Sequence, residues 1–293
     1  MDMRIRFALV ALVAAAGCAE TTSTVDLKGL NVLAMTHDDL RRQGPALMER
    51  LKHGCLDGDG NACLQAGLMY SGGRGVAKND QGAAVLFQLS CDRGSVGGCL
   101  QIASFYMSGR GVEKNFGRAA RILDHICQGG SLKGCSDLGS LYAEGKGVPR
   151  SDRRAAELFG QACDGEYPTG CYNLGVMYSA GRGVEHDDGR ALQLYTDACE
   201  HDVPAACTNL GYMTSEGRAT TKDDAKAVAL YKRACDAGNA DGCANLGFMM
   251  ATGRATQQNG VAATDLFKRA CQSGVSTGCT NLAYMFLQSS GVQ

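Results

Sequence analysis

Two cysteines separated by seven residues recur every 36 residues along this chain, and no insertion or deletion interrupts the series. A fixed period of this length is the sequence signature of stacked repeats rather than of one globular core. We therefore expect a repeat architecture. The seven pairs are Cys55–Cys63, Cys91–Cys99, Cys127–Cys135, Cys163–Cys171, Cys199–Cys207, Cys235–Cys243 and Cys271–Cys279.

The spacing within a pair predicts two helices joined by a tight turn. On one straight helix, eight residues would separate the two cysteines by about 12 Å, which exceeds the roughly 7 Å that a disulfide allows between α-carbons. The chain must therefore turn back between them, and Gly165 and Pro168 supply such a turn in the fourth pair. Residues that suit the N-cap of the second helix precede it: Asp59, Ser95, Ser131 and Asn239.

Zinc is the alternative use for so many cysteines. A structural zinc site needs four thiolates, or thiolates with histidine, in tetrahedral geometry. The five histidines of the chain stand in no fixed register to the cysteines. An even number of cysteines at a fixed spacing, behind a secretory N-terminus, favours disulfides. We expect seven disulfides, no bound metal and no cofactor.

Residues 1–17 have the pattern of a signal peptide, with Arg4 and Arg6 ahead of a short apolar segment. The group Ala15-Ala16-Gly17-Cys18 resembles a bacterial lipobox, which implies that Cys18 becomes the lipid-bearing first residue of a lipoprotein. Ordinary secretion is the alternative, but it would leave Cys18 without a disulfide partner. The alanine after Cys18 is typical of sorting to the outer membrane. We expect an exported protein, lipid-anchored on the periplasmic face of the outer membrane.

The remaining chain divides into a tether and a repeat body. Residues 18–36 are polar and lack a helical period, so we expect a tether. Residues 37–58 and 275–293 are expected to be half-repeat caps, and residues 59–274 to form six full repeats of helix A, a glycine-rich turn and helix B. Each helix B is expected to begin after an N-cap residue of one column: Asn79, Asn115, Ser151, Asp187, Asp223 and Asn259.

The repeat consensus resembles a known family. Cys-x-Asn-Leu-Gly-x-Met-Tyr, then Gly-x-Gly-Val, then Asp-x-x-x-Ala-x-x-Leu-Phe/Tyr-x-x-Ala-Cys is similar to the Sel1-like repeat, a relative of the tetratricopeptide repeat. The cysteine pair in every unit resembles its secreted, cysteine-rich Hcp-type branch. The resemblance implies an all-α, right-handed α-solenoid whose A helices line a concave surface. It also implies a scaffold that binds proteins or peptides. Some Hcp-type members are named as penicillin-binding proteins or β-lactamases, so weak β-lactamase activity is the alternative function.

The sequence contains no recognisable catalytic motif. Ser-x-x-Lys and Lys-Thr-Gly of the serine β-lactamases are absent, as is a His-Glu-x-x-His metal motif. A net charge of −1 argues against nucleic acid as a partner, because phosphate binding needs an excess of basic residues. We therefore expect no catalytic residue, and a protein or peptide as the partner. Peptidoglycan fragments are a further candidate ligand, and contact with a membrane is expected only through the lipid anchor.

A candidate binding surface follows from the faces of helix A. When helix A is turned by 100° per residue, the cysteine and the Leu-Gly step share one side, and two columns point the opposite way. One of these columns contains Tyr172. The other forms an apolar ridge in neighbouring repeats, and contiguous exposed aromatic side chains are typical of binding surfaces. This ridge consists of Val176, Tyr212, Phe248 and Tyr284.

Two alternatives accompany this prediction. The tyrosine column on the core side becomes Thr214 and Met250 in the same repeats, so the aromatic residues could have changed sides to repair the packing. A polar column also flanks the ridge, with Asn173, Asn209 and Asn245 beside the aromatic residues. The resemblance to tetratricopeptide-like grooves implies that these asparagines hold the backbone of a bound peptide. The alternative is that they satisfy backbone groups of a neighbouring repeat.

Overall fold

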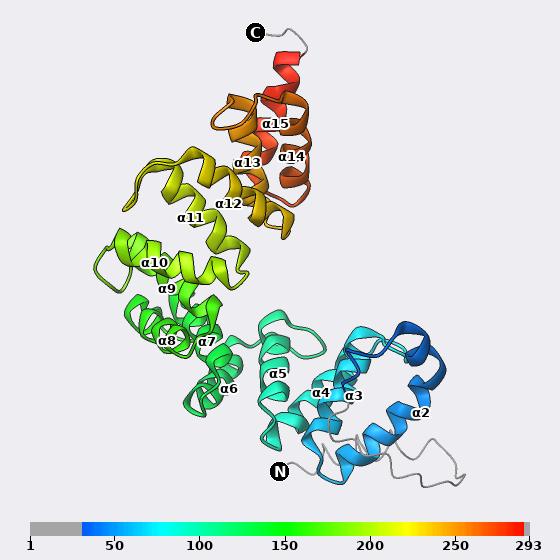
Figure 1. Cartoon of the computed structure of the whole chain (residues 1–293). Coiled ribbons are helices and arrows are strands. Elements are labelled where there is room, and N and C mark those ends of the chain that lie inside the picture. The colour runs from blue at the N-terminus through cyan, green and yellow to red at the C-terminus, as the bar shows by residue number, and fades with distance from the viewer. Residues whose placement is uncertain (1–30, 290–293) are drawn as a thin grey trace.

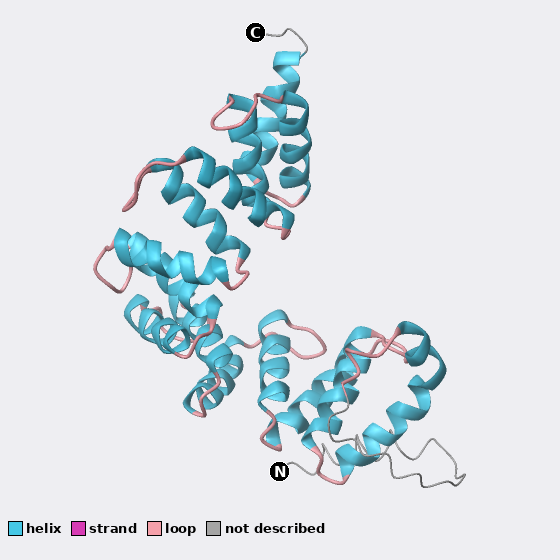
Figure 2. Ribbon diagram, in the orientation of Figure 1, coloured by secondary structure: helices cyan, strands magenta, loops and turns pink. Residues whose placement is uncertain are grey.

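The computed structural model describes residues 31–289, and within them all regular structure is helical (Figures 1 and 2). The predicted signal peptide, Cys18 and most of the predicted tether lie outside the described residues. The A helices are α3 (Gly60–Gly72), α5 (Val96–Ser108), α7 (Leu132–Glu144), α9 (Pro168–Ala180), α11 (Pro204–Glu216), α13 (Ala240–Thr252) and α15 (Ser276–Ser289). The B helices are α2 (His37–Leu56), α4 (Asp80–Asp92), α6 (Phe116–Gln128), α8 (Asp152–Asp164), α10 (Asp188–Glu200), α12 (Asp224–Asp236) and α14 (Gly260–Gln272).

The helices form one continuous helical solenoid, as predicted. Each helix packs on the helix before it and the helix after it along the chain. The stack winds so that α2 and α15 lie at opposite ends (Figure 1). None of the described helices is both long enough and apolar enough to span a membrane.

Side-chain caps explain where the helices begin and end. Helix α4 begins after Asn79, whose side chain accepts a hydrogen bond from the amide of Gly82, and the other five predicted caps of B helices act in the same way. Helices α9 and α11 begin instead with Pro168 and Pro204 in the first turn. Most A helices end at a glycine in the left-handed region, such as Gly109 at φ 75°. The predicted cap positions are therefore confirmed.

All seven predicted disulfides are present, each joining the last turn of one B helix to the first turn of the next A helix. The two α-carbons of a pair lie between 4.4 Å and 4.7 Å apart. The chain therefore folds back between the cysteines, as the seven-residue spacing requires. The disulfides connect consecutive repeats and do not close a single repeat on itself.

The Leu-Gly step of helix A makes room for an aromatic ring of helix B. A β-carbon on Gly139 would lie 2.8 Å from the ring of Phe159, and one on Gly211 would lie 2.8 Å from the ring of Tyr231. In the second repeat the ring is replaced by Leu123, and the glycine position is occupied by Ala103 in the same core cluster. The glycine is thus required by the close packing of an aromatic side chain.

The end of the predicted tether differs from the prediction. Val32 is fully buried and packs with Leu47 and Leu51 of α2 and with Ala66 of α3. Its amide donates a hydrogen bond to the Gln65 side-chain oxygen at 2.9 Å. Among the described residues no A helix precedes α2, so residues 31–36 cover part of the core in its place. The sequence of this segment, with Val32 and Met35, contained an apolar signal that the prediction of a polar tether overlooked.

Candidate binding surface on the A helices

The A helices line the inner side of the curved stack. Neighbouring A helices contact each other directly in the pairs α3–α5, α7–α9, α11–α13 and α13–α15. Among the described B helices, only α2 and α4 make a comparable contact. In a curved stack, equivalent helices of neighbouring repeats lie closer together on the inner side than on the outer side. The A helices therefore form the inner surface and the B helices the outer surface.

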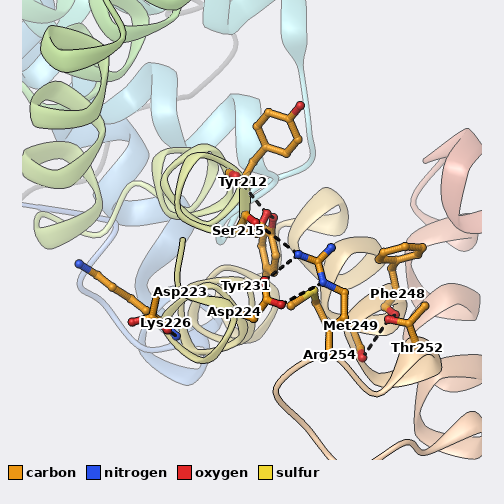
Figure 3. A network of polar contacts seen from close by, with 10 residues as sticks. All are labelled: Tyr212, Ser215, Asp223, Asp224, Lys226, Tyr231, Phe248, Met249, Thr252 and Arg254. Atoms are coloured by element: carbon orange, nitrogen blue, oxygen red, sulfur yellow. Dashed lines mark hydrogen bonds and ion pairs between the residues drawn. The ribbon is translucent and has the colours of Figure 1, made fainter. Parts of the chain in front are cut away.

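Three of the four predicted ridge residues are exposed on this inner layer. Tyr212 is 50% exposed, Phe248 45% and Tyr284 59%. They occupy equivalent positions on α11, α13 and α15, which are helices in direct contact. Figure 3 shows Tyr212 and Phe248 pointing away from the packed helices. We call these three residues the aromatic ridge.

Val176 and Tyr172 lie deeper than predicted. Val176 is half-buried and packs against the core around Leu210. Tyr172 is also half-buried, with its ring centroid 6.1 Å from that of Tyr195. Burial raises the pKa of the Tyr172 hydroxyl, and the Asp241 carboxylate raises it further. The prediction that the Tyr172 column faces solvent is therefore wrong.

The column of Tyr172 packs between repeats. Thr208, the equivalent residue in the next repeat, is 6% exposed and donates a hydrogen bond to the Asn239 side chain at 2.9 Å. Ser136, in the previous repeat, is 2% exposed. In a solenoid each A helix is covered on two sides, by its own B helix and by the adjacent repeat. A projection of one isolated helix therefore overestimates its free surface.

The asparagine column makes contacts between repeats. The Asn173 amide donates to the Ser136 hydroxyl at 3.4 Å. Burial raises the pKa of the Tyr195 hydroxyl, and a hydrogen bond from Asn209 opposes that shift. These contacts correspond to the alternative in which the asparagines satisfy neighbouring groups, although the partners are side chains and not backbone. Asn173, Asn209 and Asn245 are all half-buried, so part of each residue still faces solvent.

An ion pair between repeats lies beside the ridge, and the sequence analysis missed it. The Arg254 guanidinium donates two hydrogen bonds to Asp224, at 2.6 Å and 3.1 Å, and a third to the Ser215 carbonyl at 3.3 Å (Figure 3). It thus joins the turn of one repeat to both helices of the preceding repeat. Arg254 lowers the pKa of Asp224 by this hydrogen bonding, which favours the charged carboxylate. We call this arrangement the repeat clamp.

The repeat clamp recurs along the chain. A signal for it was present in the sequence, because in each case an aspartate stands 30 residues before the arginine of the glycine-rich turn. Helix periodicity relates residues within one helix, so it does not reveal a pair whose members lie in different repeats. The other three clamps are Asp80 with Arg110, Asp152 with Arg182, and Asp188 with Arg218.

The described residues include no candidate metal site. Among residues 31–289, no three histidine, cysteine, aspartate or glutamate side chains come together in a way that could hold a metal ion. The fourteen cysteines of the repeats are all in disulfides there.

Comparison with known proteins identifies the repeat. The Sel1 repeat family matches residues 60–95, 97–123, 132–167, 168–203, 204–239, 240–275 and 276–293. No curated protein matches the chain.

Two solved structures share the fold, and a third matches part of the chain. A protective antigen of uropathogenic Escherichia coli with an SLR fold is 26% identical, with a TM-score of 0.69 over 83% of this chain and 52% of that one. This chain therefore spans about half the length of that antigen. A Sel1 repeat protein from Oxalobacter formigenes is 22% identical, with a TM-score of 0.72 over 81% of this chain and 100% of that one. Cysteine rich protein B of Helicobacter pylori is 28% identical, with a TM-score of 0.37 over 45% of this chain and 96% of that one.

Proposed function

Because the chain belongs to the Sel1 repeat family, whose members typically mediate protein interactions, we propose that it binds a protein or peptide segment on its inner A helices. The observation that carries this proposal is the aromatic ridge. Tyr212, Phe248 and Tyr284 are large side chains, about half exposed, at equivalent positions of three consecutive repeats. Aromatic side chains grouped in this way supply most of the energy of typical protein interfaces.

The distribution of charge over the two layers supports the same surface. Every B helix carries at least two charged residues, as expected for a face in contact with water. The A helices contain few charged residues. Their charged residues are Lys133, Asp137, Glu144, Glu216 and Asp241. Depletion of charge around exposed aromatic residues is the composition of an interface core.

The disulfides indicate the cell compartment in which this binding would take place. Seven disulfides indicate an extracytoplasmic protein, because the cytoplasm keeps thiols reduced. We further propose that residues 1–17 are removed as a signal peptide and that a lipid on Cys18 holds the protein at the periplasmic face of the outer membrane. The lipobox-like residues before Cys18 support this proposal. The segment between Cys18 and Val32 would then separate the solenoid from the membrane.

The test compares the native chain with a ridge variant in which Tyr212→Ala, Phe248→Ala and Tyr284→Ala are combined. The full chain, oxidised and tagged, is used to capture envelope proteins, and the stoichiometry of each captured protein is measured. Loss of one hot-spot residue costs about 2 kcal/mol or more, so the ridge variant should retain less than one tenth of the partner. Val261→Ala is the matched control, because Val261 is 78% exposed but lies on the outer helix α14.

Two outcomes would contradict the proposal. The first is equal capture of the same partner by the native chain and the ridge variant, with both folded. The second is the absence of any stoichiometric partner together with hydrolysis of a chromogenic β-lactam by the native chain. That second result would favour an enzyme of the β-lactamase type.

A further inference from the structure

We infer that the partner segment is cationic and extended, in a polyproline II conformation with an apolar side chain at every third residue and lysine or arginine between. This inference rests on the proposed function, because it concerns the same surface. It is carried by two observations, which are the charges around the aromatic ridge and the spacing of the helices that hold it.

The charged residues on the helices that hold the ridge have one sign. Helices α9, α11, α13 and α15 contain no lysine, arginine or histidine. The charged residues on these four helices are Glu216 at the end of α11 and Asp241 in the first turn of α13, and both are exposed. The A helices of the last repeats therefore carry few charges, and those few are negative.

Asp241 acts electrostatically on Tyr172, although they lie on α13 and α9, two repeats apart. Burial is the first cause that raises the pKa of the Tyr172 hydroxyl, and the Asp241 carboxylate is the second. The charge of Asp241 thus reaches across the intervening helix α11. A bound segment that runs over these repeats would lie in its field.

The arginines of the turns after α11 and α13 are paired with aspartates. Arg218 is paired with Asp188 and Arg254 with Asp224, in both cases through two hydrogen bonds. Each guanidinium therefore has its main partner in an aspartate, and of the two only Arg254 also interacts electrostatically with Glu216. Complementary charge steers partners and excludes wrong ones, so the ridge favours a cationic segment over an acidic one.

The helix spacing indicates the conformation of the segment. Packed helices have axes about 8–10 Å apart, and α13 contacts both α11 and α15. Equivalent side chains on them therefore recur at about 9 Å. Three residues of polyproline II span about 9.3 Å and return to the same face, whereas two residues of a β-strand span only about 6.6 Å.

An α-helical partner is the competing geometry, because seven residues of an α-helix span about 10.5 Å. The asparagine column favours the extended form. A polyproline II segment has no internal hydrogen bonds, so its backbone groups are free to pair. A side-chain amide has two donor hydrogens and an acceptor oxygen, so the half-buried Asn209 and Asn245 can serve such a backbone. A helix would offer them no backbone partner.

The test uses four labelled synthetic peptides and the full oxidised chain, with binding followed by fluorescence anisotropy. The first peptide has leucine at every third position, with proline and lysine between. In the second, glutamate replaces lysine. The third has the composition of the first in an order that destroys the period. The fourth is an alanine-based helix with leucine at every seventh position and lysine between. We expect the first peptide to bind at least tenfold more tightly than the others, and to weaken as salt is raised.

Substitutions on the chain test the charges directly. Glu216→Gln combined with Asp241→Asn should weaken the first peptide severalfold and reduce its salt dependence. Asp265→Asn, at an exposed position of the outer helix α14, is the control and should change neither. Equal or tighter binding of the acidic, reordered or helical peptide would overturn the inference, as would a double variant that binds like the native chain.

The two proposals fail differently. If the natural partner depends on the aromatic ridge but is captured equally by the Glu216→Gln, Asp241→Asn variant, the cationic inference is wrong and the proposed function stands. If the ridge variant captures the partner as well as the native chain does, both are wrong.

Discussion

Lys146 lies over the ring of Phe116, with its Nζ atom 5.6 Å from the ring centroid. These two residues occupy the positions at which the four repeat clamps pair an arginine with an aspartate. At this junction a cation–π contact replaces the ion pair. Both contacts join the turn of one repeat to the first turn of helix B in the preceding repeat. Junctions between repeats are therefore held by an ion pair or by a cation–π contact. Only the ion pair contains a carboxylate that titrates in acid.

The repeat clamps should make stability depend on pH. In three of them the arginine lowers the pKa of its aspartate: Asp80, Asp152 and Asp224. A folded-state pKa below the unfolded value of about 4 gives stability that is present above pH ~4 and is lost as the pH falls through the folded-state pKa. We expect the urea midpoint to fall over this range, and the fall to be smaller in Asp152→Asn. Asp236→Asn, on the outer helix α12, is the control, and an unchanged pH profile in Asp152→Asn would refute the prediction.

The glycine of the Leu-Gly step should be coupled to the aromatic residue of helix B. Alanine at position 139 would gain about 1 kcal/mol of helix propensity, but its β-carbon would lie 2.8 Å from the Phe159 ring. Overpacking costs about 1–3 kcal/mol, so we expect Gly139→Ala to be destabilising by up to about 2 kcal/mol in urea denaturation.

A double variant distinguishes this packing effect from other causes. Phe159→Leu should cost less in the Gly139→Ala background than in the native chain, because Ala103 and Leu123 already coexist in the second repeat. Additive costs of the two substitutions would mean that the ring and the glycine are not coupled.

The features that could be predicted from the sequence are those fixed within one turn or one helix. The caps such as Asn79, the disulfides and the Leu-Gly step depend on neighbours close in sequence, and the 36-residue period repeats each signal. The missed features depend on how repeats stack. Tyr172 faces the next repeat, and Asp224 finds Arg254 only across a junction. Val32 is buried because α2 has an open side, which no local pattern reveals.

Removing one disulfide should destabilise the chain locally. For Cys163→Ala combined with Cys171→Ala, the loop-entropy estimate gives a loss of about 2–3 kcal/mol. In a solenoid each repeat contacts only its neighbours, so faster amide exchange should be confined to α8, α9 and the helices packed on them. Cys271→Ala with Cys279→Ala provides the comparison, with faster exchange in α14 and α15. Uniformly faster exchange across all helices would show that the solenoid unfolds as a single unit.

The lipid anchor predicts a specific effect of Cys18→Ser. The variant should lose incorporation of labelled fatty acid and move from the membrane fraction to the soluble periplasmic fraction. Its seven disulfides should form as in the native chain, because Cys18 is not among the paired residues. If native and variant proteins fractionate alike and neither carries lipid, the chain is secreted in the ordinary way.

The last two glycine-rich turns contain strained alanines. Ala219 and Ala255 have a φ of 52°, in the left-handed region that the equivalent Gly183 occupies at 71°. This conformation costs a non-glycine residue about 1–2 kcal/mol. Glycine removes that cost, but it destabilises the fold by about 0.4–1 kcal/mol because it raises the conformational entropy of the unfolded chain. We therefore expect Ala219→Gly and Ala255→Gly each to stabilise the chain by about 0.5–1 kcal/mol.

At Gly183 the reverse change should be severe, because a β-carbon there would lie 2.2 Å from the Asp152 carbonyl. Gly183→Ala should destabilise by about 2 kcal/mol or more, and similar small effects at all three positions would contradict the assignment of strain.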